Sequence, residues 1–207
     1  PVIYNTKRFR SSLEAWGQEL KAVARFKTGK DESIFVNVAV SAVGTDGALN
    51  NLKELDGKDF AAVRAEAEDL WENELGKYDL DSDDKVLRET FYTSVYRTAL
   101  HPFLFEDADG RFREHDGTIG KAEDFTNVTT FSLWDTYRAF HPLLNLVNKP
   151  LQADIANSML AHFDKSTEKM LPIWSFYGGE TWCMIGYHAC SVLADMMAST
   201  TNAPSRR

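Results

Sequence analysis

The sequence contains little cysteine and no long apolar run. Only Cys183 and Cys190 occur among its 207 residues, seven positions apart. Two turns of one helix would separate them by roughly 10 Å, which is too far for a disulfide. We therefore expect two buried core thiols, the usual state of free cysteine, which reveal nothing about the compartment. No stretch approaches the roughly 18 apolar residues that cross a bilayer, so no membrane span is expected.

Positive charge is also scarce, because 23 lysines and arginines stand against 31 acidic residues and the net charge is −8. A surface that binds nucleic acid or an anionic membrane is therefore not expected. The first ten residues, PVIYNTKRFR, contain no initiator methionine and no apolar region of a signal peptide. We expect from this that the sequence is an internal portion of a longer protein.

Several enzyme motifs are missing too. There is no Gly-rich phosphate loop, no Gly-x-Ser-x-Gly elbow, and no His-x-x-x-His or Glu-x-x-His pair for a transition metal. The run EDADGRFREHDG at residues 106–117 is acidic, but its spacing does not match an EF-hand. We interpret it as solvated loop charge with two Asp-Gly turns, in a hairpin or an excursion between helices over residues 106–127.

Strand signals are concentrated near the N-terminus. Residues 33–43, SIFVNVAVSAV, are rich in β-branched side chains and partly alternate, which predicts a strand. Residues 9–27 admit further strands, although residues 12–24 also admit a helix. Turn signals at Asp46-Gly47 and Asp56-Gly57 end this portion.

From Asp59 onward the apolar pattern is helical. Asp59 is a candidate N-cap for a helix that runs to about Leu75 and ends at Gly76. A second helix is predicted to begin at Ser82 and to stop before Pro102, since proline cannot continue a helix.

Three more helices are predicted after residue 130. One covers residues 132–147 despite Pro142, the next begins near Pro150, and the last runs from Glu180 or Thr181 to Met197. The middle one carries an apolar face made of Leu151, Ile155, Met159 and Phe163.

Two stretches are unusual for helical packing. The first, TTFSLWDTYR, places Trp134, Asp135 and Arg138 within about one turn at a predicted helix start. A Trp ring offers a flat face to a sugar, and a carboxylate and a guanidinium both bind neighbouring hydroxyls. An ordinary first-turn acid beside a salt-bridging Arg and a core Trp remains an alternative.

In the second stretch, aromatic residues crowd around Glu180 after a Gly-Gly pair that allows a sharp turn. These aromatic residues are Trp174, Phe176, Tyr177 and Trp182. Desolvation favours a protonated carboxyl group, the form that a general acid needs. His188, eight residues later on the predicted helix, could share a face with Glu180. The alternatives are a first-turn Glu that stabilises the helix dipole and a structural His.

The combination of FSLWDTYRA with GETWCMIGYHA resembles glycoside hydrolase family 92, and the similarity extends over most of residues 34–198. Members of that family are calcium-dependent exo-α-mannosidases that invert anomeric configuration. The resemblance implies a mainly α chain, with the last strands of an N-terminal β-sandwich at residues 1–57. A helical linker is expected at residues 58–101, and the first part of an (α/α)₆ catalytic barrel at residues 102–207.

Carried over to this sequence, the resemblance implies that Glu180 is the general acid and that Trp134, Asp135 and Arg138 line the mannose subsite. Trp182 and His188 are further candidates for substrate binding. The family often has Asn where Gly179 stands and a smaller or polar residue where Trp182 stands, which implies an altered leaving-group subsite. Calcium is the expected cofactor, and most of its ligands, like the catalytic base, are expected outside this sequence.

The resemblance also implies α-mannoside substrates from N-glycans or mannans and a secreted, periplasmic or cell-surface location. We expect the 207-residue chain alone to be inactive, and to self-associate or to need the remainder of the barrel. Two other functions stay open: a non-catalytic carbohydrate-binding module, and a purely structural helical domain with an aromatic core.

Overall fold

The computed structural model describes residues 2–4 and 18–199, and the chain divides into two compact units, Pro1–Val36 and Asn37–Arg207. In the first unit, strands β1 (Val2–Tyr4) and β2 (Lys21–Val23) pair in antiparallel fashion. A strand therefore lies within residues 9–27 as predicted, and the alternative helix is wrong at residues 21–23. Residues 9–17, the rest of that prediction, lie outside the described residues.

The predicted strand at residues 33–43 is wrong, because these residues form no regular element. Most of their β-branched side chains project into solvent, and Val40 is 81% exposed. β-propensity produces a strand only where the segment pairs with a neighbouring strand or packs on a buried face, and the residues that the structure describes provide neither for this segment. The Asp46-Gly47 turn is also wrong, since both residues lie in helix α1 (Thr45–Leu52). The Asp56-Gly57 turn is confirmed, after the 3₁₀ helix η1 (Lys53–Leu55).

The next two helices follow the sequence closely. Helix α2 (Phe60–Leu75) begins after Asp59, whose carboxylate accepts the Ala62 N–H at 2.8 Å, and it ends at Gly76. Helix α3 (Lys85–Thr98) is capped by Asp84 rather than Ser82 and stops before Pro102. Both predicted helices are confirmed, and the start of the second moves by two residues.

Short strands connect α3 to the C-terminal helices. Strand β3 (Phe103–Leu104) pairs with β6 (Val128–Thr129), and between them β4 (Arg111–Arg113) and β5 (Ile119–Lys121) form the predicted hairpin. The acidic loop is not wholly solvated, because Asp107 is only 4% exposed. The Asp107 carboxylate accepts hydrogen bonds from the Ser41 hydroxyl at 2.7 Å and the Asn51 amide at 2.8 Å, which compensate the cost of burying its charge.

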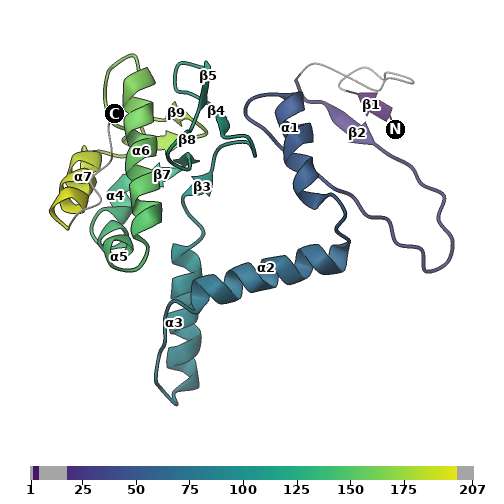
Figure 1. The fold of residues 1–207 in the computed structure, drawn as a ribbon, viewed down its shortest axis with the longest axis horizontal. Coiled ribbons are helices and arrows are strands. Elements are labelled where there is room, and N and C mark those ends of the chain that lie inside the picture. The colour runs from purple at the N-terminus through teal and green to yellow at the C-terminus, as the bar shows by residue number, and fades with distance from the viewer. Residues whose placement is uncertain (1, 5–17, 200–207) are drawn as a thin grey trace. The chain divides into compact units, whose positions relative to one another are not determined.

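Four helices form the C-terminal part: α4 (Leu133–Thr136), α5 (Phe140–Val147), α6 (Lys149–Lys165) and α7 (His188–Ala198). Helices α5, α6 and α7 pack against one another (Figure 1). Their apolar faces enclose the core with the neighbouring strands, as eight buried side chains show: Val128, Phe131, Leu133, Leu144, Ile155, Met159, Ala189 and Val192. Helices are the main regular elements of the described residues, as the mainly α prediction requires.

The continuous helix predicted at residues 132–147 is wrong, because the chain breaks between α4 and α5. Pro142 has no N–H and its ring would collide with the carbonyl four residues earlier in a continuous helix. Because the helix restarts at Phe140, Pro142 lies in its first turn, where a backbone N–H would have no carbonyl partner within the helix. Helix α6 is confirmed, with Pro150 in its first turn and Asn148 accepting the Leu151 N–H at 3.3 Å.

The last helix begins at His188, not at residue 180 or 181. Residues 174–180 form a hairpin instead: β8 (Trp174–Phe176) and β9 (Gly179–Glu180) join β7 (Phe131–Ser132) in the order β7-β8-β9. The turn residues Tyr177 and Gly178 both have positive φ, 48° and 78°, as a type I′ hairpin requires. Glu180 is therefore at the end of a strand.

The prediction of two buried thiols is wrong, because Cys183 and Cys190 are both free and exposed. Cys183 lies in the loop before α7, and the inward face of α7 is already occupied by Ala189, Val192 and Met196. No helix of the described residues is long and apolar enough to cross a membrane.

Candidate active site

The first group of predicted site residues surrounds the short helix α4. Trp134 is 48% exposed, so part of its side chain is open to a ligand. The exposed Asp135 accepts a hydrogen bond from the Ser132 hydroxyl. Arg138, just after the helix, donates from Nε to the Tyr137 hydroxyl at 2.7 Å, and its guanidinium lies 5.4 Å from the Tyr137 ring centre. These contacts hold the two charged groups at the surface, where polar ligands are accessible.

Glu180 is held in place by backbone donors. Its carboxylate accepts N–H groups from Ile173 at 2.7 Å, Trp174 at 3.0 Å and Trp182 at 2.8 Å. The β8–β9 hairpin makes this possible, because it turns the chain so that Glu180 lies opposite Ser175. Three donors from one hairpin restrict the rotation of the carboxylate, so its position is defined before any ligand arrives.

The aromatic residues near Glu180 in the sequence are mostly open to solvent and do not form the crowded, desolvated setting that the sequence predicts. Trp182 is 52% exposed, and Phe176 and Tyr177 are exposed on the same hairpin. The Phe176 and Tyr177 rings lie 4.2 Å apart, and the Trp174 ring is 6.0 Å from that of Phe176. An exposed aromatic group of this kind is unusual in a packed core and offers apolar faces to a ligand.

The sheet brings the two unusual stretches together. Strand β7 pairs with β8 so that Ser132 lies opposite Trp174, and the Trp174 indole donates to the Ser132 hydroxyl at 2.8 Å. The Glu180 hairpin and the segment that carries Asp135 are therefore neighbours in one sheet. The sequence did not predict that Ser132 and Trp174 would join the two stretches. The alternation of apolar and polar side chains in residues 131–132 and 174–176 was the only available signal for these strands.

His188 does not share a helix face with Glu180, because Glu180 is not helical. Its ring stacks on Tyr137 with centres 4.2 Å apart and planes at 9°. Gly186, with φ of 90°, is required before it, since a Cβ there would lie 2.5 Å from His188 Nε2. His188 is thus joined to Arg138 through Tyr137, so it still lies beside the first group of site residues.

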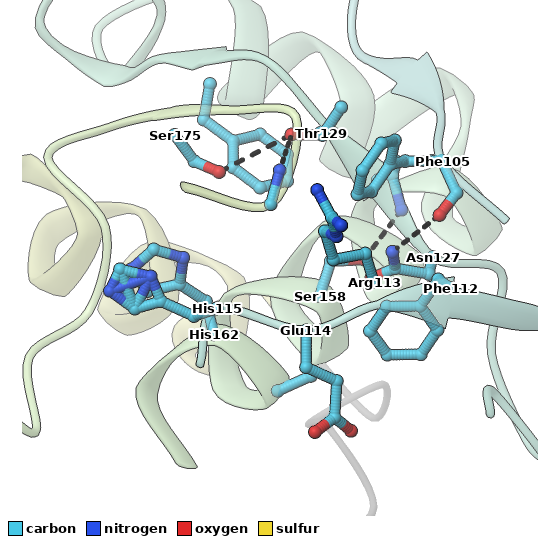
Figure 2. A pocket seen from close by; sticks show the side chains of 14 residues that line it. Phe105, Phe112, Arg113, Glu114, His115, Asn127, Thr129, Ser158, His162 and Ser175 are labelled. Atoms are coloured by element: carbon cyan, nitrogen blue, oxygen red, sulfur yellow. Dashed lines mark hydrogen bonds between the residues drawn. The ribbon is translucent and has the colours of Figure 1, made fainter. Parts of the chain in front are cut away.

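A cavity that was not predicted is lined in part by Phe131 of β7 and Ser175 of β8, the residue opposite Glu180 in the sheet. Figure 2 shows the His115 and His162 rings one over the other in its lining, with centres 4.3 Å apart, and the Thr129 and Ser175 hydroxyls nearby. Burial lowers the pKa of His162 to about 4. The neighbouring His115 contributes to this lowering of the pKa, and the negative charges of Glu180 and Glu168 oppose it, so His162 senses the charge of the candidate acid.

No group of three or more His, Cys, Asp or Glu side chains that could hold a metal ion occurs within residues 18–199. Calcium takes six to eight oxygen ligands. These residues by themselves therefore do not fit a complete calcium site.

Comparison with known proteins identifies the family of the chain. A search of curated proteins found no match. Among solved structures, the GH92 alpha-mannosidase BT3965 from Bacteroides thetaiotaomicron, in complex with mannoimidazole, is 64% identical over 96% of this chain, with a TM-score of 0.84. The GH92 inverting mannosidase BT2199 from Bacteroides thetaiotaomicron VPI-5482 is 28% identical over 76%, with a TM-score of 0.68.

The chain spans 26% and 21% of the lengths of these two structures. The model of the glycosyl hydrolase family 92 catalytic domain matches residues 47–205, most of the sequence. On both findings, this chain belongs to glycosyl hydrolase family 92.

Proposed function

We propose that this chain is part of an inverting α-mannosidase that removes terminal α-linked mannose from N-glycans or mannans, with Glu180 as its general acid. The single observation that carries the proposal is the place of Glu180 at the end of β9, in the same three-stranded sheet whose strand β7 leads directly into α4 and Asp135. Two solved relatives are described as mannosidases, one of them as inverting, which supports the same chemistry.

In this proposal, Glu180 protonates the glycosidic oxygen as the bond to the leaving group breaks. A second carboxylate, roughly 6.5–9.5 Å from the acid, activates the attacking water in an inverting enzyme. We assign that role to no residue of this chain. The chain therefore supplies the acid and part of the sugar subsite, and we propose that it is inactive by itself.

The mannose subsite of the proposal is built on α4 and the residues around it. The exposed indole of Trp134 packs against the sugar ring, and Asp135 and Arg138 bind its hydroxyls. Trp182, two residues after Glu180 in the loop that follows β9, contacts the leaving group, and His188 borders the subsite through its stacking on Tyr137. Calcium remains the proposed cofactor, with ligands that come mostly from outside the described residues.

The proposed function also implies a division of the chain into three parts. Residues 1–57 are the end of a β-sandwich, residues 58–101 a helical linker, and residues 102–207 the first part of an (α/α)₆ barrel. Because mannose-bearing glycans occur outside the cytoplasm, we propose a secreted, periplasmic or cell-surface location.

The test of Glu180 is its replacement by Gln in a form of the enzyme that hydrolyses α-mannosides. Loss of a general acid lowers turnover about 10²–10⁴-fold on substrates with poor leaving groups such as mannobiose. Activated aryl mannosides need little protonation and lose far less. Glu123→Gln, at an exposed loop carboxylate, is the matched control and leaves both rates unchanged. Equal losses on both substrate types would refute the role of Glu180.

A non-catalytic carbohydrate-binding module is the second candidate. The exposed faces of Trp134 and Trp182 favour it, because sugar stacking requires no catalytic carboxylate. Mannose binding that survives Glu180→Gln, in a protein that never hydrolyses α-mannosides with or without a chelator, would identify this function. A purely structural domain would leave the fluorescence of both Trp side chains unchanged during a mannose titration.

A further inference from the structure

The Ser132 hydroxyl lies between two groups of the candidate site. The Trp174 indole Nε1–H approaches it at 2.8 Å, and the Asp135 carboxylate accepts from it. An indole N–H only donates and an ionised carboxylate only accepts. The Ser132 hydroxyl must therefore accept from Trp174 and donate to Asp135, so the direction of both hydrogen bonds is determined.

The same series continues to the candidate acid. The backbone N–H of Trp174 donates to the Glu180 carboxylate at 3.0 Å, and Ser132 and Trp174 are partners across the β7–β8 ladder. Asp135, Ser132, Trp174 and Glu180 thus form one continuous set of contacts. Its middle members, Ser132 and Trp174, are half-buried, where hydrogen bonds are stronger than in open water.

We propose that Ser132 is a positioning residue, which holds the Asp135 carboxylate in a fixed place relative to Glu180 through its hydroxyl and the Trp174 indole. The inference rests on the proposed function, in which Asp135 binds mannose. Asp135 is exposed and Ser132 is its one hydrogen-bond donor among the described residues. Without that donor the carboxylate samples several rotamers, and fixing it again on binding costs affinity.

The experiment measures mannoimidazole affinity by calorimetry in a form of the enzyme that hydrolyses α-mannosides. Ser132→Ala weakens binding about tenfold, the size of one charge-assisted hydrogen bond. Trp174→Phe keeps an aromatic ring without the N–H donor and weakens binding to a similar extent. The double variant binds no more weakly than Ser132→Ala alone, because both changes break one series of contacts. Ser132→Thr, which keeps the hydroxyl, restores most of the affinity.

Asp135→Asn distinguishes a failure of the positioning role of Ser132 from a failure of the proposed mannose subsite. If Asp135→Asn and Ser132→Ala both weaken binding, and Ser132→Ala has no further effect in the Asp135→Asn background, the inference holds. If Asp135→Asn weakens binding but Ser132→Ala does not, the positioning role is wrong and the proposed function stands. If Asp135→Asn changes nothing, the mannose subsite and the inference both fail.

A spectroscopic measurement on the 207-residue chain covers the case in which Ser132→Ala does not fold. The Trp174 indole N–H resonance in an ¹H–¹⁵N spectrum moves on Asp135→Asn if Ser132 transmits the change, because the carboxylate polarises the hydroxyl that accepts from the indole. The indole N–H of Trp71, on α2 with its ring against Tyr96, provides the control resonance. An unmoved Trp174 resonance would overturn the inference.

Discussion

The buried His162 makes the stability of this chain sensitive to mild acid. His162 is 8% exposed on α6 and stacks on His115, and its pKa in the folded protein is about 4. An unfolded chain returns the imidazole to its ordinary value of 6.5. Between these values the unfolded state binds the proton more tightly, so the free energy of unfolding falls as the pH drops from 6.5 to 4.

The size of the effect follows from the two pKa values. The drop from 6.5 to about 4 corresponds to roughly 3 kcal/mol, at about 1.36 kcal/mol for each pKa unit. The full stabilising contribution is present above pH 6.5, and it is lost progressively down to pH 4. Because domains of this size unfold with about 5–15 kcal/mol, this loss is a large fraction of the total.

Urea unfolding at pH 7, 5.5 and 4.5 measures the loss directly. His162→Gln removes one titrating ring and leaves His141, whose pKa burial also lowers, so the stability of the variant changes less over this range than that of the original chain. His101→Gln, at an exposed histidine, is the matched control and keeps the original pH dependence. The slope with pH is the decisive quantity, since His162→Gln also loses the ring stacking and is less stable at every pH.

Equal pH slopes for the original chain and His162→Gln would refute the reasoning. A second result tests the proximity of the acid: NMR titration should find the pKa of His162 lowered further in Glu180→Gln, because the Glu180 charge raises it. An unchanged titration would mean that the two side chains do not interact.

Two further predictions concern the proposed mannosidase. Asp135→Asn weakens α-mannoside binding in an active form of the enzyme but leaves the melting temperature nearly unchanged, because the side chain is exposed. A large loss of stability with unaltered kinetics would contradict a role of Asp135 in the mannose subsite. The 207-residue chain alone, assayed with calcium on mannobiose, shows no turnover, and light scattering finds a mass above that of a monomer because apolar side chains such as Leu146 and Ile185 are exposed. A monomer with chelator-sensitive activity would mean that a carboxylate of this chain is the base, and Asp116 and Asp135 would be examined first.

Local features of the sequence predicted the helices correctly wherever the determining contacts are local. Asp59 caps α2 through an N–H three residues away, and Asn148 does the same for α6. Pro150 restricts the chain to a first helical turn by its own ring. The family could also be identified from the sequence, because FSLWDTYRA and GETWCMIGYHA are contiguous runs of residues.

Tertiary contacts decided the features that the sequence analysis predicted wrongly or missed. Residues 33–43 have strand propensity but no partner strand among the described residues, whereas residues 174–180 became strands because β7, more than 40 residues earlier, pairs with β8. That pairing removed Glu180 from the predicted helix and placed Trp174 against Ser132. The types of residue in the candidate site were thus readable from the sequence, but their mutual positions depend on a strand register, which is determined by partners distant in the chain.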